Sequence, residues 1–349
     1  GGPATPSQIA RLEEILHQRI SEGFDFNLES VAYYEEKGLI KYFDAKDTYI
    51  RHIKKRLDME AIRKADFKVI FDPMHGAGMR MLEGLIDKVF ELHSEWNPGF
   101  GNVDHPEPIE SCLVDLISTI KSGEFDFGLA TDGDADRLGA VDEEGNFVDS
   151  HKIFMILLRY LYENKGKRGD VVKTVSLTSM VDMYCEDKGI TLHETPVGFK
   201  YTAEIMTEKN VLVGGEESGG LGTSLHIPER DGIFNGLLLL EAMAVTGKSL
   251  KELCDDLDDE FGPHRYHRID KKMTQEEKDT ILNAAYKIPS KIGRFEVERV
   301  DTKDGIKFYF NHAWLLIRAS GTEPLLRFYA EAESMTVVNE LLHEAMDLK

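Results

Sequence analysis

Apolar residues near the N-terminus repeat at the spacing of an amphipathic helix. The repeat follows Pro6-Ser7 and comprises Ile9, Leu12, Ile15, Leu16 and Ile20. A period of about 3.6 residues predicts a helix. Gly23 marks its expected end, because glycine favours the left-handed conformation that closes helices. A second, basic helix is predicted from about Lys46 to Leu57.

The pattern changes at Phe67, where a short β-rich run begins. Phe67 to Asp72 reads as a strand, Pro73 to Gly78 as a turn, and Met79 to Ile86 as a following helix. Strand-like runs followed by loops of Gly, Asp, Ser or Thr recur at 125–130, 171–177 and 211–215. This alternation is typical of α/β units, so we expect two successive α/β domains.

A helical stretch from Gly232 to Leu257 leads into the acidic run Asp255–Glu260 and then Gly262-Pro263, which marks a domain boundary. The remaining residues predict a separate α+β domain, with strands at 294–299, 308–310, 314–318 and 325–330 and helices near 276–286 and 336–348. The expected division is 1–45 as a linker and the end of a further N-terminal α/β domain, 46–150 and 151–258 as α/β domains, and 259–349 as the α+β domain.

Composition and charge narrow the class of protein. The chain has 349 residues, of which 42% are hydrophobic and 30% charged, which favours packed globular domains over disorder. No apolar stretch is long enough to span a bilayer. A net charge of -21 argues against nucleic-acid binding. The three cysteines are widely spaced and form no C-x-x-C pair, so we expect a cytoplasmic protein. No secretory signal precedes the first helix, and we expect the N-terminus to be a cut end.

The first candidate motif is the loop Thr131–Arg137, which follows an apolar strand. Its carboxylates alternate at Asp132, Asp134 and Asp136, and their mutual repulsion would be relieved by a hard divalent cation such as Mg²⁺. A solvated acidic turn is an equal alternative for the motif alone. A calcium-binding EF-hand is disfavoured because Arg137 replaces the required glycine and strands flank the loop. An aspartyl phosphatase would leave Arg137 unexplained.

The second motif, Gly214–Gly220, holds Glu216 and Ser218 among glycines that let the backbone approach a ligand closely. Their carboxylate and hydroxyl suit sugar hydroxyl groups. Alone, the run reads more readily as a Gly-rich turn with a solvated acidic pair. The neighbouring segments 196–200 and 226–232 add Lys200 and Arg230 as candidate cations.

The third motif runs from Arg318 to Pro324, with Arg327 downstream. Arg318 offers a bidentate fork for phosphate, Ser320 and Thr322 offer hydroxyl donors, and Gly321 permits a tight turn, so the loop could cradle an anion. No Walker pattern is present, and a strand rather than a helix is expected to follow. An ordinary Ser-Gly-Thr turn is an equal alternative.

The order and spacing of the three motifs resemble the α-D-phosphohexomutase superfamily, closest to bacterial phosphoglucomutase/phosphomannomutase enzymes. The resemblance implies that Asp132, Asp134 and Asp136 bind Mg²⁺, and that Arg137 lies beside a phosphoserine. By the same resemblance, the sugar-binding residues are Glu216 and Ser218, the cations around the substrate are Lys200 and Arg230, and the phosphate-binding residues are Arg318, Ser320, Gly321, Thr322 and Arg327.

The implied reaction interconverts hexose 1-phosphate and hexose 6-phosphate through a phosphoserine and a bisphosphorylated sugar. The family's Thr-Ala-Ser-His-Asn-Pro segment, which carries that serine, is absent from these residues. Ser218 and Ser320 already belong to ligand-binding motifs. We therefore expect an inactive portion of a mutase or, alternatively, a phosphosugar-binding or regulatory paralogue. Glucose and mannose both remain possible as the hexose, with Glu216-Glu217-Ser218 leaning towards phosphoglucomutase by resemblance.

Overall fold

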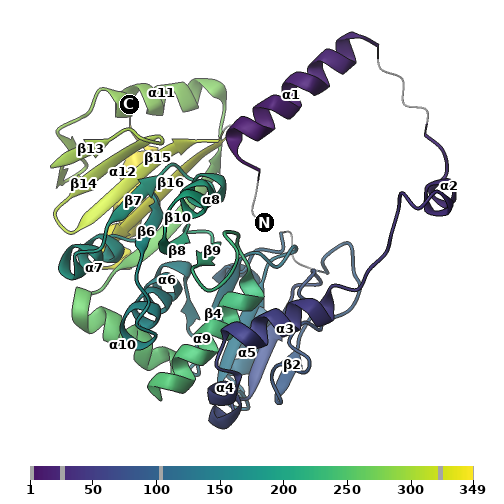
Figure 1. Ribbon diagram of the computed structural model, residues 1–349. Helices are drawn as coiled ribbons and strands as arrows, with labels where there is room; N and C mark the ends of the chain where they lie inside the picture. The colour runs from purple at the N-terminus through teal and green to yellow at the C-terminus, as the bar shows by residue number, and fades with distance from the viewer. Residues whose placement is uncertain (1–3, 24–27, 102–104, 321–324, 349) are drawn as a thin grey trace.

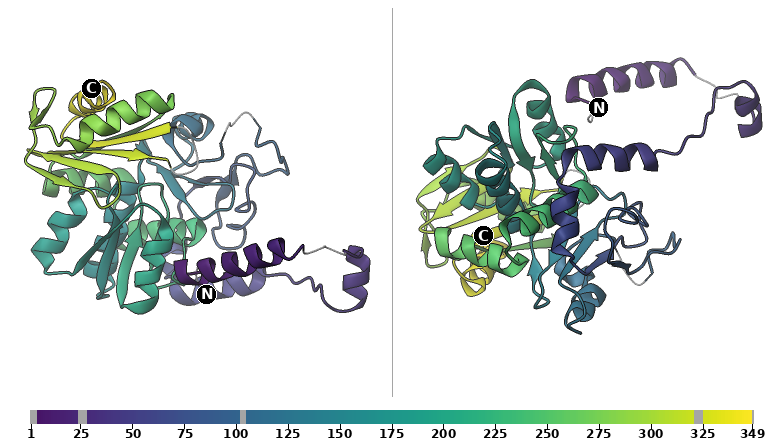
Figure 2. Two further views of the ribbon diagram at one scale, coloured as in Figure 1. Left: turned by 90° about the horizontal axis from the view of Figure 1, so that it is seen from above. Right: turned by 60° about the horizontal axis from the view of Figure 1, so that its bottom comes forward.

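The computed structural model describes residues 4–23, 28–101, 105–320 and 325–348. The first helices, α1 (Pro6–Ser21) and α2 (Val31–Glu36), form an arm that extends away from the body (Figures 1 and 2). Thr5 caps α1 in a capping box with Gln8, so the predicted helix is confirmed. Its apolar residues face solvent, with Leu12 60% and Ile20 63% exposed.

The first α/β domain is built around a five-stranded sheet in the order β2-β1-β3-β4-β5. β1, β2 and β3 are parallel, whereas β4 and β5 are antiparallel additions. Its elements are α3 (Lys46–Arg56), α4 (Met59–Ala65), β1 (Val69–Asp72), β2 (Val89–Glu91), the 3₁₀ turn Glu110–Cys112, α5 (Val114–Ile120), β3 (Phe127–Thr131), β4 (Leu138–Val141) and β5 (Phe147–Val148).

The second α/β domain repeats this plan with four strands in the order β7-β6-β8-β9, in which β9 is antiparallel. Its elements are α6 (Ser150–Arg159), the π-helical turn Tyr160–Asn164, β6 (Asp170–Thr174), α7 (Met180–Lys188), β7 (Leu192–Thr195), α8 (Phe199–Glu208), β8 (Val211–Gly215), β9 (Leu221–Thr223), α9 (Gly232–Thr246) and α10 (Leu250–Phe261).

The C-terminal domain is an antiparallel sheet in the order β10-β16-β15-β14-β13, flanked by helices. Its elements are β10 (Arg265–Lys272), α11 (Gln275–Tyr286), the small hairpin β11 (Lys291–Ile292) and β12 (Phe295–Glu296), β13 (Arg299–Asp301), β14 (Ile306–Phe310), β15 (Ala313–Ala319), β16 (Leu325–Ala332) and α12 (Met335–Met346). The expected fold class, two related α/β domains followed by an α+β domain, is confirmed.

Helix α9 is the common core of both α/β domains. Every residue from Gly232 to Met243 is buried, and α9 packs against α4 and α6. The fully buried Glu241 carboxylate accepts hydrogen bonds from Tyr160 Oη (2.6 Å) and Asp58 N (2.8 Å). Within the described residues, no single helix is long and apolar enough to cross a membrane. The pair α9 and α10 has the length and composition but is bent by 81°.

A small apolar cluster joins the C-terminal domain to the second α/β domain. Trp314, Leu316 and Tyr329 of the C-terminal sheet pack against Val175, which follows β6. Lys307 Nζ lies 4.1 Å from the Trp314 ring and donates to Val175 O at 2.5 Å. Burial and the nearby Lys173 ammonium lower the pKa of Lys307 to about 7. Lys307 and the Trp314 ring beside it are therefore shielded from water at this point of the interface.

Some predicted elements were wrong. Met79 to Ile86 is not a helix, because Arg80 (φ 62°) and Gly84 (φ 76°) adopt left-handed conformations that interrupt helical hydrogen bonding. The predicted helical stretch Gly232 to Leu257 is confirmed and consists of two helices, α9 and α10, since Gly247 ends the first in a left-handed cap. The predicted strand 294–299 is divided between β12 and β13, which belong to different sheets. The long strand β10 was not anticipated.

Candidate functional site

The three aspartates of the first motif lie on one tight connection between β3 and β4. These strands pair as a hairpin with Thr131 opposite Leu138, so the chain must reverse within Asp132–Arg137. Asp132 is buried, Asp134 is exposed and Asp136 is partly buried. One carboxylate oxygen of each lies within 4.8 Å of the others. This is an oxygen-rich arrangement that a hard divalent cation could occupy.

The Asp132 carboxylate accepts backbone hydrogen bonds that hold the turn Asp132–Arg137, here called the metal loop, in its conformation. Its Oδ1 accepts hydrogen bonds from the backbone N–H groups of Asp136 (2.9 Å) and Arg137 (3.0 Å). Burial, assisted by the charges of Asp136 and Asp134, raises the pKa of Asp132 to about 7. Burial also raises the pKa of Asp136. The loop thus holds more negative charge than its own residues stabilise.

The turn after β1 packs against the metal loop. Ala77 N donates to Gly133 O (2.9 Å), and a Cβ on Gly76 would lie only 2.6 Å from that same oxygen. The segment Pro73–Gly78, which the sequence predicted as a turn, therefore fits against the metal loop because glycine occupies position 76.

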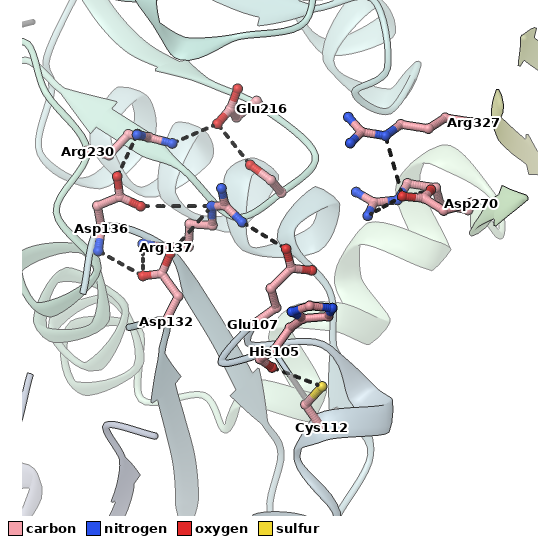
Figure 3. Close-up of polar contacts among 12 residues, drawn as sticks. His105, Glu107, Cys112, Asp132, Asp136, Arg137, Glu216, Arg230, Asp270 and Arg327 are labelled. Carbon is pink, nitrogen blue, oxygen red and sulfur yellow. Dashed lines mark hydrogen bonds and ion pairs between the residues drawn. The ribbon is translucent and has the colours of Figure 1, made fainter. Parts of the chain in front are cut away.

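Arg137 is directed at carboxylates on two sides. Its Nη1 lies 3.3 Å from Glu107 Oε1, and its Nε lies 3.5 Å from Asp132 Oδ2 (Figure 3). Burial acts to lower its pKa, but the neighbouring carboxylates outweigh burial and raise the pKa of Arg137. Glu107 was not a candidate in the sequence, because a single glutamate between two prolines carries no recognisable pattern.

The second motif forms the connection between β8 and β9 and lies directly on the metal loop. Leu138 N donates to Gly219 O (3.2 Å), and Arg137 forms an isolated antiparallel bridge with Gly220. Gly219 has φ 95°, and a Cβ there would lie 2.6 Å from Leu138 O. A side chain at this position would push the two loops apart.

Within this second loop, Glu216 is almost fully buried. Its Oε1 accepts a hydrogen bond from Ser218 Oγ (2.9 Å) and pairs with Arg230 Nη1 (3.1 Å). Burial, with help from the charge of Glu217, raises the pKa of Glu216. Arg230 also pairs with Asp136, at 2.5 Å between Nη2 and Oδ2. Arg230 therefore joins the metal loop to the Glu216–Ser218 loop, as Figure 3 shows.

Lys200 does not join this group. It lies exposed in the first turn of α8, with Nζ 4.9 Å from the centre of the Tyr201 ring. Among the described residues it makes no hydrogen bond or ion pair with the metal loop or with Glu216 and Ser218. Its side chain would have to reach a ligand from the edge of the site.

The third motif lies on the C-terminal sheet. Arg318 of β15 and Arg327 of β16 are register partners, and each has a carboxylate neighbour. Arg318 Nε donates to both oxygens of Asp304 (3.0 and 2.9 Å), and Arg327 Nε lies 3.4 Å from Asp270. Both arginines were candidates in the sequence, whereas Asp304 and Asp270 were missed.

The remaining phosphate-loop candidates are partly outside the described residues. Ser320 is buried, and its backbone N–H donates to Leu325 O (3.1 Å). Gly321 and Thr322 lie outside the described residues. A further arginine, Arg268 of β10, pairs with Asp270 at 2.9 Å beside Arg327. The alternation of Arg268 and Asp270 along β10 could have signalled this pair, had that strand been predicted.

The fold and the site define a multidomain α/β protein with a carboxylate loop suited to a divalent cation, a buried Glu–Ser pair and an arginine-bearing C-terminal sheet. The chain belongs to the phosphoglucomutase/phosphomannomutase family. The family's alpha/beta/alpha domain II matches residues 47–145, its alpha/beta/alpha domain III matches 149–261, and its C-terminal domain matches 269–348. These matches confirm the resemblance that the motifs suggested.

Individual relatives agree with this membership. A phosphoglucomutase/phosphomannomutase of Thermococcus kodakarensis is 33% identical over 91% of this chain and 68% of its own length. A phosphoglucosamine mutase of Methanococcus vannielii is 30% identical over 100% of this chain and 75% of its own length. A Thermus thermophilus structure, assigned as a phosphomannomutase, has 35% identity and a TM-score of 0.76, over 87% of this chain and 65% of its own. The chain thus spans about two thirds to three quarters of these relatives.

Proposed function

We propose that this chain forms the metal-binding and phosphosugar-binding portion of a mutase that interconverts hexose 1-phosphate and hexose 6-phosphate. The observation that carries the proposal is the direct contact between the metal loop and the Glu216–Ser218 loop. Arg230 pairs with Asp136 on one side and Glu216 on the other. A cation and a sugar held by these loops would be neighbours, as transfer of a phosphoryl group to a sugar hydroxyl requires.

Asp132, Asp134 and Asp136 fit Mg²⁺ because all three supply hard oxygen ligands from one short loop. Two guanidinium groups, those of Arg137 and Arg230, pair with Asp132 and Asp136, so three carboxylates face two cations and the loop remains net negative. When bound, the ion would draw charge from the reacting phosphoryl group. The protein's own part is to hold these carboxylates together through the backbone donors to Asp132.

Replacing Asp134 with asparagine is expected to weaken Mg²⁺ binding by roughly tenfold or more, because one of three charged ligands is lost. Calorimetric titration of Mg²⁺ into the wild-type chain and the Asp134→Asn variant measures the difference. Glu144→Gln, an exposed charge change in the same domain, is the control and should bind as the wild type does. Indistinguishable isotherms for Asp134→Asn and wild type would count against the metal site.

Among the candidate residues, the cations would contact phosphate and the Glu216–Ser218 pair would hydrogen-bond the sugar. Arg137 would lie against the reacting phosphoryl group, and Lys200, proposed on resemblance alone, would act as a second cation. Glu216 and Ser218 would bind sugar hydroxyls, with Arg230 holding the loop. The phosphate that is not reacting would be bound on the C-terminal sheet by Arg318, Ser320, Gly321, Thr322 and Arg327. Such charge-assisted contacts are suited to orienting a sugar phosphate in either direction.

The proposed ligand class is a hexose phosphate, with glucose or mannose as the sugar. The relatives include proteins named phosphoglucosamine mutase, so an amino sugar phosphate is a further candidate within the same class.

The sequence also carries two further proposals. We propose that the protein is cytoplasmic, and that its domains comprise residues 1–45, 46–150, 151–258 and 259–349.

Replacing Arg318 with alanine is expected to weaken glucose 6-phosphate binding by about tenfold to a hundredfold, because a charged hydrogen bond to phosphate is lost. Binding of unphosphorylated glucose should change little, since Glu216 and Ser218 are untouched. Calorimetric titrations of both ligands test this. Arg294→Ala, which removes an exposed arginine of the same domain, is the matched control. Equal losses for both ligands would contradict the phosphate assignment.

We further propose that this chain, alone, turns over no substrate. The mutase reaction needs a nucleophile that carries phosphate between the two half-reactions. The family's Thr-Ala-Ser-His-Asn-Pro segment, which carries the nucleophilic serine, is absent from this sequence. The second candidate function, a phosphosugar-binding or regulatory protein, rests on the same absence.

A further inference from the structure

The N-terminus of α9 is packed directly on the metal loop. Gly232 N donates to Ala135 O (2.9 Å), and a Cβ on Gly232 would come within 2.4 Å of Arg137 O. The backbone at this point can therefore shift little relative to the metal loop without breaking a contact.

Arg230 precedes this contact by two residues and depends on it. Its guanidinium makes the two pairs, to Asp136 and Glu216, that join the metal loop to the Glu216–Ser218 loop. Both pairs are geometrically demanding, because one planar group must meet two carboxylates at once. A shift of the Asp231–Gly232 backbone would move Arg230 away from at least one of them.

Asp231 fixes that backbone through a set of contacts converging on its carboxylate. Oδ1 accepts from Phe234 N (2.8 Å), which caps α9, and Tyr49 Oη donates to Oδ1 (2.8 Å) and Oδ2 (2.9 Å). His226 Nε2 lies 2.9 Å from Oδ2. The Tyr49 hydroxyl thus adds a tertiary contact to what would otherwise be a local capping interaction.

Phe234 and His52 hold the His226 ring in place beside Asp231. The His226 ring stacks on Phe234, with centres 4.5 Å apart and planes at 8°, and its Nδ1 lies 2.8 Å from His52 Nε2. Tyr49 and His52 both belong to α3, which meets the chain just before α9 through the contacts to Asp231 and His226. Burial and the Asp231 charge raise the pKa of Tyr49, so its hydroxyl keeps the proton that it donates.

We propose that Tyr49 is a positioning residue for Arg230, acting through Asp231 to keep the metal loop and the Glu216–Ser218 loop in register. This inference rests on the proposed function for its consequence in ligand binding. Among the described residues, Tyr49 makes no hydrogen bond with either loop, so its influence must pass through Asp231 and the backbone at Gly232. Small displacements of this kind weaken sites that bind by several simultaneous contacts.

The Tyr49→Phe variant removes the hydroxyl and preserves the ring. With Mg²⁺ present, glucose 6-phosphate binding should weaken by about threefold to tenfold, the usual size of coupling between linked residues. Tyr286→Phe, an exposed tyrosine on α11, is the control and should bind as the wild type does. If the wild type binds and Tyr49→Phe binds equally well, the positioning role is overturned.

A ligand-free measurement separates this inference from the proposed function. Urea unfolding of wild type, Tyr49→Phe, Arg230→Ala and the double variant forms a double-mutant cycle. Tyr49 and Arg230 form no hydrogen bond with each other, so a purely local role for Tyr49 gives additive losses of stability. Coupling transmitted through Asp231 makes the losses non-additive, with Tyr49→Phe costing less once Arg230 is gone. Additive losses overturn the inference, whether or not the wild type binds a sugar phosphate.

Discussion

The wild-type chain is expected to convert no measurable glucose 1-phosphate to glucose 6-phosphate, even when primed with glucose 1,6-bisphosphate. Transfer of phosphate between two sugar oxygens through an enzyme needs a group that holds the phosphate between the two steps. The serines of the ligand-binding motifs are poorly suited to this role. Ser218 Oγ is hydrogen-bonded to Glu216, and Ser320 is buried beside the C-terminal sheet. A coupled assay that detects glucose 6-phosphate measures the conversion.

The control for this assay is a full-length relative measured under the same conditions, which establishes that the primer and Mg²⁺ suffice for turnover. Ser218→Ala and Ser320→Ala variants extend the test. Robust turnover by the wild type would contradict the proposal of an inactive chain, whether or not either variant lowers the rate, because both serines belong to ligand-binding motifs.

Replacing Glu331 with alanine is expected to destabilise the contact between the C-terminal domain and the second α/β domain by about 3–5 kcal/mol, the usual cost of breaking a buried charged network. Glu331 is almost fully buried. It accepts hydrogen bonds from Ser179 N (3.0 Å) and Trp314 Nε1 (3.0 Å), and it lies 3.1 Å from His264 Nδ1. Alanine would leave these donors buried without a partner.

Urea unfolding followed by tryptophan fluorescence measures this loss, because Trp314 is one of only two tryptophans in the sequence and lies in the network. Glu333→Ala, an exposed change on the same segment, is the control. Coincident unfolding curves for Glu331→Ala and wild type would show that Glu331 contributes nothing to the interface.

The pH dependence of this contribution has a definite sign. Burial acts to raise the pKa of Glu331, but its hydrogen bonds and the charge of His264 outweigh burial and hold the pKa well below the usual range. A carboxylate with a depressed pKa stabilises the folded state above its unfolded pKa. The Glu331 contribution is therefore expected to be complete above the unfolded pKa and to be lost progressively as pH falls from there to the lowered value.

Elements with strong local signals were predictable from the sequence. α1 follows from its apolar period and its cap, and β8 matches the predicted 211–215 because a short apolar run ends in two glycines. The prediction of a helix at Met79 to Ile86 was wrong, because apolar spacing alone does not distinguish a helix from an irregular packed segment. The left-handed backbone at Arg80 depends on Glu91, whose carboxylate accepts from Arg80 N at 2.9 Å, a tertiary contact that no local pattern encodes.

The candidate site divides in the same way. The sequence located the carboxylates of the metal loop because they lie on one short segment. It could not predict that Arg230 pairs with Asp136, or that Gly219 packs against Leu138, since these contacts join loops from separate domains. Tyr49, Glu107 and Asp304 were missed for the same reason, because each acts through a partner that is distant in the chain.

The most direct test of the central claim is calorimetric titration of glucose 6-phosphate into the wild-type chain in the presence of Mg²⁺. The account predicts saturable binding that weakens when Mg²⁺ is withheld and is lost in a folded Glu216→Ala/Arg318→Ala variant, because these residues would hold opposite ends of the ligand. An absence of binding by the folded wild type, or binding that the double variant retains in full, would contradict it.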